Sequence, residues 1–316
     1  MSEFFDYWLG LFQHEVVQNA FLAGTMVAII TAVMGYFVVL RAQAFAGEAL
    51  ADIGFAGATG AAVLGVSSLL GMFFLTVLAA LGMGALGERI RGRDVEIGMV
   101  LSFALGLGVL FLTIYAQYGT NASEGVGVLF GSILSVTRSD VLMTLVCGLA
   151  ILIVLALVFR PLLFASIDPE VAETRGVPVR FLSILFLVLL GITTAETVLV
   201  VGVLLVLALL IAPAASAVQL THRPLTSVLL SVALGLLITW GGLILAFVGT
   251  WGHFPVSFYI SAASALCYFI SVGVSRLRSP RRYREIPPSC STCSRPYATP
   301  RPSRGLSAWE PTNRGD

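Results

Sequence analysis

Residues 141–159 read Val-Leu-Met-Thr-Leu-Val-Cys-Gly-Leu-Ala-Ile-Leu-Ile-Val-Leu-Ala-Leu-Val-Phe, without one charged side chain. An α-helix of about 20 apolar residues is long enough to span the hydrocarbon core of a membrane. Comparable stretches recur between Val16 and Val274, and the 316-residue chain is 58% hydrophobic and only 11% charged. Soluble domains carry about 25% charged residues. The composition therefore excludes a soluble fold and predicts an all-α polytopic membrane protein.

The apolar stretches also predict where the helices lie, and we expect eight or nine of them to cross the membrane. The stretch 181–220 is ambiguous, because it fits either two spans or one span followed by a shorter, broken helix. The predicted helices are 16–40, 48–66, 68–88, 96–116, 140–160, 181–196, 200–220, 225–248 and 256–275.

Arginine placement predicts the sidedness of these helices. The chain has no lysine, so all 18 residues counted as Lys and Arg are arginine. All of them except Arg138 fall in alternate connections or beyond the last predicted helix. Because cytoplasmic loops concentrate such residues, nine crossings place the N-terminus outside and the C-terminus in the cytoplasm. The net charge of +1 gives no indication of a nucleic-acid partner.

The absence of lysine also bears on the energy source. The phosphate-binding loop of an ATPase needs the lysine of its GxxxxGK[ST] motif to reach the phosphates, and this chain has none. If transport by this protein is driven by ATP, another polypeptide must hydrolyse the ATP.

Three regions follow from the composition: an extracytoplasmic N-terminus (1–15), a transmembrane domain (16–277) and a cytoplasmic tail (278–316). The tail is rich in Pro, Ser and Arg, and such a segment buries too little apolar surface to become ordered. Cys290 and Cys293 form a lone CxxC, without a second pair or a nearby histidine to complete a zinc site. Arginines of the tail can contact anionic membrane lipid, although fixing the topology explains them more simply.

Glu48 and Asp52 are the leading candidates for chemistry inside the membrane. They are four positions apart and therefore share one helical face. A charge in the bilayer costs roughly 2.5–3.5 kcal/mol on insertion scales, which makes intramembrane carboxylates functional candidates. A hard divalent cation would offset their mutual repulsion, because carboxylate oxygens suit such ions. The alternative is that Arg41, seven positions earlier, neutralises Glu48 near the membrane boundary.

Glu196 and His253 are secondary candidates for the path of a metal ion. Glu196 lies at the break between two apolar runs and is flanked by threonines, so we expect it near the outer face. There it would either attract ions or extend to water. His253 lies in the outer loop 249–255, where it could meet incoming metal, although a solvated or interfacial polar role explains it more simply.

A short segment between two predicted helices has the clearest local pattern in the chain. Asp168 is a good N-cap, and Pro169 suits the first helical position. Glu170 favours the positive end of the helix dipole, and Gly176 suits the residue that follows the C-cap. A helix of about two turns is not stable alone in water. It must therefore pack on a partner protein or on the ends of its own neighbouring helices.

Four separated segments carry recognisable motifs. They are 47–57, with Gly-Glu-Ala-Leu-Ala-Asp and a later glycine; 94–98 with 129–134; 168–179, ending in Gly-Val-Pro-Val; and 201–217, with Val-Gly-Val-Leu-Leu and Pro-Ala-Ala-Ser-Ala. Together they resemble the membrane permeases of the ABC-3 family of zinc, manganese and iron importers of bacteria. Each motif alone is weak, but all four occur in the order and spacing of the family, within about residues 18–275.

The resemblance implies an all-helical permease that works as a homodimer in the bacterial plasma membrane. Its partners would be cytoplasmic ATP-binding subunits and an extracytoplasmic metal-binding protein. A divalent metal would be the transported substrate, no cofactor would be bound permanently, and the partner would hydrolyse ATP, so this chain would not itself be an enzyme. The resemblance also implies that 168–176 is the coupling helix seated in the ATPase, through Asp168, Pro169, Glu170, Glu173, Arg175 and Gly176.

Two positions depart from the family pattern. The metal-path motif of the family pairs an acid with a histidine four residues later, whereas this chain has Glu48 and Asp52. Replacing imidazole by carboxylate favours harder ions such as manganese or ferrous iron over zinc. The glycine that usually follows the proline of the last outer loop is also missing, since Val256 follows Pro255.

Two other classes of function remain open from the sequence. A proton-coupled secondary transporter would use Glu48, Asp52 and Glu196 as a relay, but it would have no need of the capped helix at 168–176. A membrane scaffold without transport activity would leave the buried acids unexplained.

Overall fold

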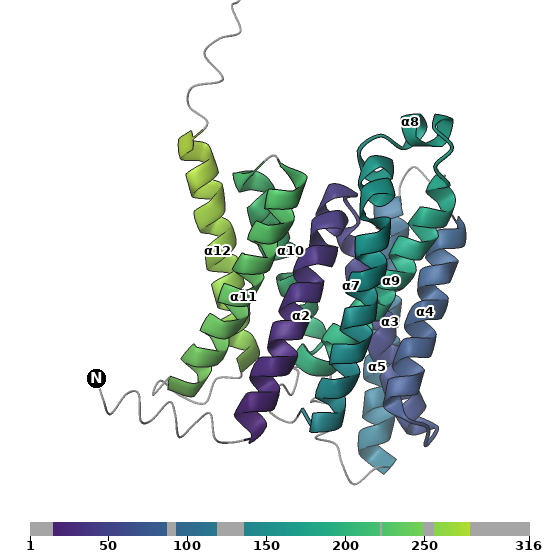
Figure 1. Cartoon of the computed structure of the whole chain (residues 1–316). Helices are drawn as coiled ribbons and strands as arrows, with labels where there is room; N and C mark the ends of the chain where they lie inside the picture. Colours follow the sequence, from purple (N-terminus) through teal and green to yellow (C-terminus); the bar gives the residue numbers. More distant parts are fainter. Residues whose placement is uncertain (1–14, 87–92, 119–135, 222, 249–255, 279–316) are drawn as a thin grey trace, which may run out of the picture. The chain divides into compact units, whose positions relative to one another are not determined.

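The computed structural model describes residues 15–86, 93–118, 136–221, 223–248 and 256–278, and all regular structure in them is α-helical (Figure 1). The chain divides into two units, Met1–Ser275 and Arg276–Asp316, and the helical bundle belongs to the first apart from the last residues of α12. The helices are α2 (Glu15–Leu40), α3 (Ala44–Val63), α4 (Ser68–Leu86), α5 (Arg93–Tyr118), α7 (Arg138–Ile167), α8 (Pro169–Thr174), α9 (Val179–Val201), α10 (Val203–Leu220), α11 (Pro224–Val248) and α12 (Val256–Arg278).

Eight of the described helices are long and apolar enough to cross a membrane, namely α2, α4, α5, α7 and α9 to α12. The prediction of an all-α polytopic protein with eight or nine such helices is therefore confirmed. Helix α3 has 20 residues, but its two acids and its many alanines and glycines make it less apolar than the others. Most of its side chains are buried in the bundle, where α4, α5, α9 and α10 pack around it.

The bundle is organised around α2 and α9, which are the most buried of the membrane-spanning helices. Helix α2 packs against α7, α9, α10 and α11, whereas few residues of α4, α5 and α12 are fully buried, as in helices that face lipid on one side. Close helix packing depends on small residues. A side chain at Gly57 of α3 would lie 2.6 Å from the carbonyl oxygen of Gly71 of α4, and such residues let membrane helices approach closely.

The ambiguous stretch 181–220 forms two helices, α9 and α10. They are separated at Gly202, which has φ +91° and ψ 159°. This backbone conformation is essentially restricted to glycine, so the residue type itself ends α9. The break comes after Val201 and not at 196–200, where the pattern of apolar residues placed it.

Helix α7 is longer than the predicted 140–160. It runs for 30 residues through Pro161 to Ile167, which corresponds to about 45 Å at 1.5 Å per residue. A proline inside a membrane helix is tolerated because neighbouring groups satisfy the backbone that it frees. Since the hydrocarbon core is about 30 Å thick, α7 extends beyond it and carries α8 outside the apolar layer.

Two sets of contacts mark the ends of the bundle. At one end the Arg138 guanidinium donates to the Glu15 carboxylate over 2.7 Å and joins the starts of α7 and α2. Both side chains are exposed, so this pair contributes at most about 1 kcal/mol. At the other end Arg41 binds Ser166 at the end of α7 and Ser183 at the start of α9, the two helices that flank α8 in the chain. Arg138, the one arginine outside the predicted cytoplasmic set, thus lies at the end opposite Arg41.

Some predictions fall outside the described residues. They concern residues 1–14, the loop with His253, the motif at 129–134, and residues 279–316 with their CxxC. The sidedness of the membrane also stays a prediction.

Candidate functional site

Glu48 and Asp52 lie in the second and third turns of α3. Asp52 is buried, with 5% of its surface exposed, and Glu48 is half-buried. A side chain at Gly108 of α5 would meet Phe55, at 2.5 Å, and Ala56 of α3. Asp52 lies one turn before these two residues on the same side of the helix, so α5 covers it. Asp52 is therefore enclosed by protein through helix packing, whereas Glu48 is only partly covered.

The structure shows no ion pair between Arg41 and Glu48, the alternative that the sequence leaves open. Arg41 lies in the turn between α2 and α3, and Ala42 in that turn has a φ of +52°. The turn interrupts the helix, so the seven-residue spacing does not place Arg41 and Glu48 on one face. The guanidinium instead reaches α7 and α9. Within the described part of the chain the ion pair is Arg138 with Glu15, and none forms at Glu48.

Among the described residues, Glu48 and Asp52 are the metal-binding side chains that lie on α3. Among the described residues, no three His, Cys, Asp or Glu side chains lie close enough to hold a metal ion. Hard divalent cations take about six oxygen ligands. A metal ion that binds Glu48 and Asp52 must therefore take further ligands from water or from another chain.

Glu196 lies elsewhere in the bundle, and its expected approach to water is wrong. Its side chain is 2% exposed, and its Oε1 would lie 3.5 Å from a side-chain carbon at Gly148 of α7. The preceding residue, Ala195, faces α3 in a cluster with Phe55, so Glu196 points to a different side of α9. Because α9 continues to Val201, neighbouring helices enclose the carboxyl.

No hydrogen bond from a described residue reaches either carboxylate oxygen of Glu196. The nearby hydroxyls are engaged within their own helix: Thr193 donates to the Leu189 carbonyl over 2.8 Å, and Thr197 donates to the Thr193 carbonyl over 2.7 Å. An ionised carboxylate buried without donors is very costly. Among the described residues, no hydrogen bond links Glu196 to Glu48 or Asp52.

Glu196→Gln is expected to leave metal uptake close to that of the unchanged protein. Glutamine keeps the shape of the side chain, and no described residue donates a hydrogen bond to the carboxylate of Glu196. Uptake into vesicles over a range of pH would check this expectation. Loss of uptake in a correctly assembled Glu196→Gln protein would contradict it and would favour the proton-coupled alternative.

Helix α8 has the capped geometry that the sequence predicts. The Asp168 carboxylate accepts a hydrogen bond from the Val171 N–H over 3.1 Å, and Pro169 occupies the first helical position. Gly176 has a φ of +82°, and beyond it the Val177 N–H donates to the Ala172 carbonyl over 3.1 Å. This pair of features closes the helix as a glycine-terminated C-cap does.

Helix α8 has one residue packed against the bundle, and its other residues are exposed. Ala172 is fully buried and belongs to the main hydrophobic cluster of the bundle, together with Val179 and Leu182 of α9. Glu170, Val171, Glu173, Thr174 and Arg175 are exposed. The helix thus rests on its own bundle through a single small side chain and presents its other residues outward.

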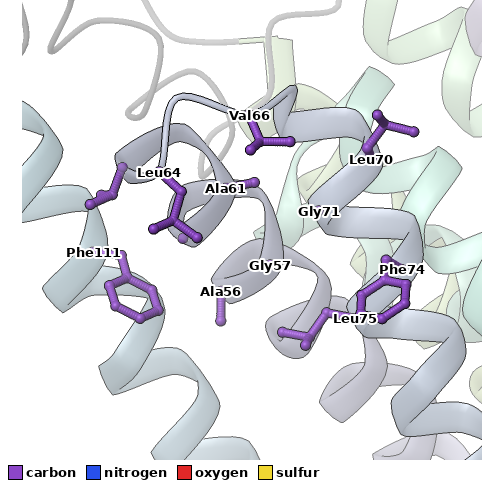
Figure 2. A pocket seen from close by; sticks show the side chains of 12 residues that line it. Ala56, Gly57, Ala61, Leu64, Val66, Leu70, Gly71, Phe74, Leu75 and Phe111 are labelled. Atoms are coloured by element: carbon purple, nitrogen blue, oxygen red, sulfur yellow. The ribbon is translucent and has the colours of Figure 1, made fainter.

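A separate apolar cavity of about 600 Å³ lies between α3, α4 and α5 (Figure 2). Its lining contains small and aliphatic residues with two phenylalanines, Phe74 and Phe111, and no metal-binding side chain. Gly57, Gly60 and Gly71 leave room there. These glycines of α3 and α4 therefore shape a cavity whose apolar lining is unsuited to carrying an ion.

The contacts of Arg41 are the feature that sequence reasoning missed. They join residues 125 and 142 positions apart, and no local spacing signals them. The residue types alone, an arginine after a helix and serines near two other helix ends, are too common to identify such a link.

Comparisons with known proteins cover nearly the whole bundle. The model of the ABC 3 transport family matches residues 13–274. The manganese transport system membrane protein MntC of Halalkalibacterium halodurans is 34% identical over 224 residues, 71% of this chain and 75% of the relative. The manganese import system permease protein ScaB of Streptococcus parasanguinis is 32% identical over 272 residues, covering 86% and 94%. The solved structure of PsaBC from Streptococcus pneumoniae in complex with Fab superposes with a TM-score of 0.74 at 28% identity, covering 85% of this chain and 94% of that one.

Proposed function

This chain belongs to the ABC 3 transport family, and on that basis we propose that it is the membrane permease subunit of an ATP-driven importer of a divalent transition metal. The observation that carries the proposal is the pair of half-buried Glu48 and buried Asp52, four positions apart on α3, in the segment that resembles the metal-path motif of the family. The family membership supports transport, and the acid pair supports a cation as the substrate.

Manganese is the metal that we propose first, with ferrous iron next. Both named relatives are manganese transport proteins, and a donor set of carboxylate oxygens suits manganese better than zinc. One chain supplies two carboxylates. In a homodimer, two copies of α3 would supply four, which together with water would complete the coordination of a hard ion.

The partners that we propose follow from the open faces of the chain. The exposed side of α8 would seat in a cytoplasmic ATP-binding subunit, and an extracytoplasmic protein would deliver the metal at the opposite end. ATP hydrolysis belongs to that subunit, because this chain has no lysine for a phosphate-binding loop. This arrangement puts α8 in the cytoplasm and the start of α2 outside.

Reconstitution tests the proposal. The chain, its ATP-binding partner and its metal-binding partner are placed in vesicles, and manganese uptake is measured with and without ATP. We expect uptake that requires ATP and both partners. Uptake driven by a pH gradient without ATP would support the proton-coupled transporter, and the absence of any uptake would support the scaffold.

Truncation after Ser279 is expected to leave uptake and complex assembly intact. The removed residues are rich in Pro, Ser and Arg and offer no apolar face for packing. Uptake assays and co-purification of the ATP-binding subunit would measure the effect. If the truncated chain no longer retained that subunit, the tail would be an interaction element.

A further inference from the structure

Arg41 connects three parts of the bundle. Its Nε donates to the Ser166 hydroxyl of α7 over 2.8 Å, and its Nη1 donates to the Ser183 hydroxyl of α9 over 3.3 Å. The guanidinium carbon lies 5.0 Å from the centre of the Phe186 ring, also on α9. Arg41 itself belongs to the turn that leads from α2 into α3. One side chain thus connects the turn before α3 with the end of α7 and the start of α9.

The two serines flank α8. Ser166 comes two residues before its N-cap Asp168, and Ser183 lies in the first turns of α9. A helix of six residues that packs through Ala172 alone has little stability of its own. A force applied to α8 is therefore passed to the end of α7 and the start of α9, which are the two segments that Arg41 binds.

The turn that contains Arg41 is held firmly. The Arg41 N–H donates to the Phe37 carbonyl over 2.9 Å, and the Gln43 N–H donates to the Val38 carbonyl over 2.9 Å. Ala42 is held at a φ of +52°, which alanine rarely adopts. Helix α3 begins directly after this turn, and Glu48 lies in its second turn. A displacement of the guanidinium is therefore transmitted to the start of the helix that carries the acid pair.

The apolar part of the junction does not depend on the guanidinium. Phe37 of α2 packs against Phe159 of α7, with ring centres 5.4 Å apart, and against Phe186 of α9, at 6.5 Å. These three rings keep α2, α7 and α9 together when the polar contacts above them are removed. Variants of Arg41 are therefore expected to fold and to reach the membrane.

We propose that Arg41 is a positioning residue that couples α8 to the acid pair Glu48 and Asp52. This inference rests on the proposed function, because an ATP-binding partner must move α8. The two hydrogen bonds require the forked donors of a guanidinium. Lysine retains the charge but concentrates it on one ammonium group, so it cannot reproduce both contacts in the same geometry.

The test compares Arg41→Lys with Arg223→Lys in the reconstituted complex. Arg223 is a suitable control because it is exposed in the turn before α11 and its backbone carbonyl accepts hydrogen bonds within that turn. Manganese uptake and ATP hydrolysis are measured in the same vesicles. For Arg41→Lys we expect hydrolysis to continue while the metal imported per ATP falls at least about fivefold, the lower end of coupling effects between distant sites. The Arg223→Lys control is expected to import as much metal per ATP hydrolysed as the unchanged protein does.

A second variant keeps the inference testable if Arg41→Lys fails to assemble. The double change Ser166→Ala and Ser183→Ala removes both acceptors and leaves the cation over Phe186, and it should lower the same ratio. An unchanged ratio, or a parallel fall of uptake and hydrolysis, would show that Arg41 only holds the helices together. If the unchanged complex itself shows no ATP-dependent uptake, the proposed function fails, and that result is separate from any effect of Arg41.

Discussion

Manganese uptake is expected to fall by more than about 100-fold in Glu48→Gln and in Asp52→Asn, since loss of an outer-shell partner alone costs roughly 10–100-fold in metal affinity. Each change keeps the shape of the side chain and removes one negative charge from the acid pair. Passage through the bundle requires transient binding that replaces part of the hydration shell of the ion. Uptake by reconstituted vesicles and co-purification of the ATP-binding subunit would be measured together.

Assembly should survive these changes, because removing a charge from a buried position also removes the cost of burying it. Glu15→Gln is the matched control. It makes the same chemical change at a carboxylate that is exposed and paired with Arg138. Uptake equal to that of the unchanged protein in both Glu48→Gln and Asp52→Asn would exclude the acid pair from the metal path.

Asp52→His extends this experiment to metal selectivity. The change restores the acid and histidine pair that the family pattern has, and imidazole suits zinc better than a second carboxylate does. The ratio of zinc to manganese uptake is therefore expected to rise. An unchanged ratio would show that selection takes place before the metal reaches α3.

Glu173→Arg is expected to separate ATP hydrolysis from metal uptake. Glu173 is on the exposed side of α8, so the change reverses a charge on the surface that we propose to contact the ATP-binding subunit. Gly176→Val should have a similar effect for a different reason. Its φ of +82° lies in the left-handed region, where a residue with a side chain costs roughly 1–2 kcal/mol.

Matched variants separate these two causes. Glu173→Gln removes the charge without reversing it and should have the smaller effect. Gly176→Asn tests the backbone alone, because asparagine tolerates the left-handed conformation and no atom lies within 4 Å of a side-chain carbon placed at Gly176. Normal uptake per ATP in both Glu173→Arg and Gly176→Val would remove α8 from the mechanism.

Local features of this protein could be predicted well from its sequence. The capping residues of α8 interact with backbone groups only a few positions away. Asp168, Pro169 and Gly176 therefore predict the helix that the structure contains. The apolar stretches likewise predict the membrane helices to within a few residues, apart from the extension of α7 through Pro161. The helix caps and the apolar stretches depend on residues that are close in the sequence, so they can be predicted from the sequence alone.

Features that depend on packing between distant helices could not be predicted. Pairing of Arg41 with Glu48 is one of two alternatives that the sequence leaves open, and the seven-residue spacing favours it only in a continuous helix, whereas the turn directs Arg41 to Ser166 and Ser183. Glu196 was expected near water because it lies close to the end of an apolar stretch, yet α7 and α2 cover it. In both cases the packing of helices that are distant in the sequence determines the contacts of the side chain, and residue spacing does not specify that packing.

The low apolarity of α3 has a consequence for the biogenesis of the protein. During synthesis each helix leaves the translocon in order, and aspartate near the centre of a helix opposes insertion by roughly 2.5–3.5 kcal/mol. Two of the helices that enclose α3, α9 and α10, are made more than 100 residues later. Helices α4 and α5 can pack on α3 soon after it is made, but its packing against α9 and α10 has to wait for the second half of the chain. A truncated chain that ends before Val179 should leave the side of α3 that meets α9 and α10 open to water-soluble labelling reagents when a residue on that side is replaced by cysteine.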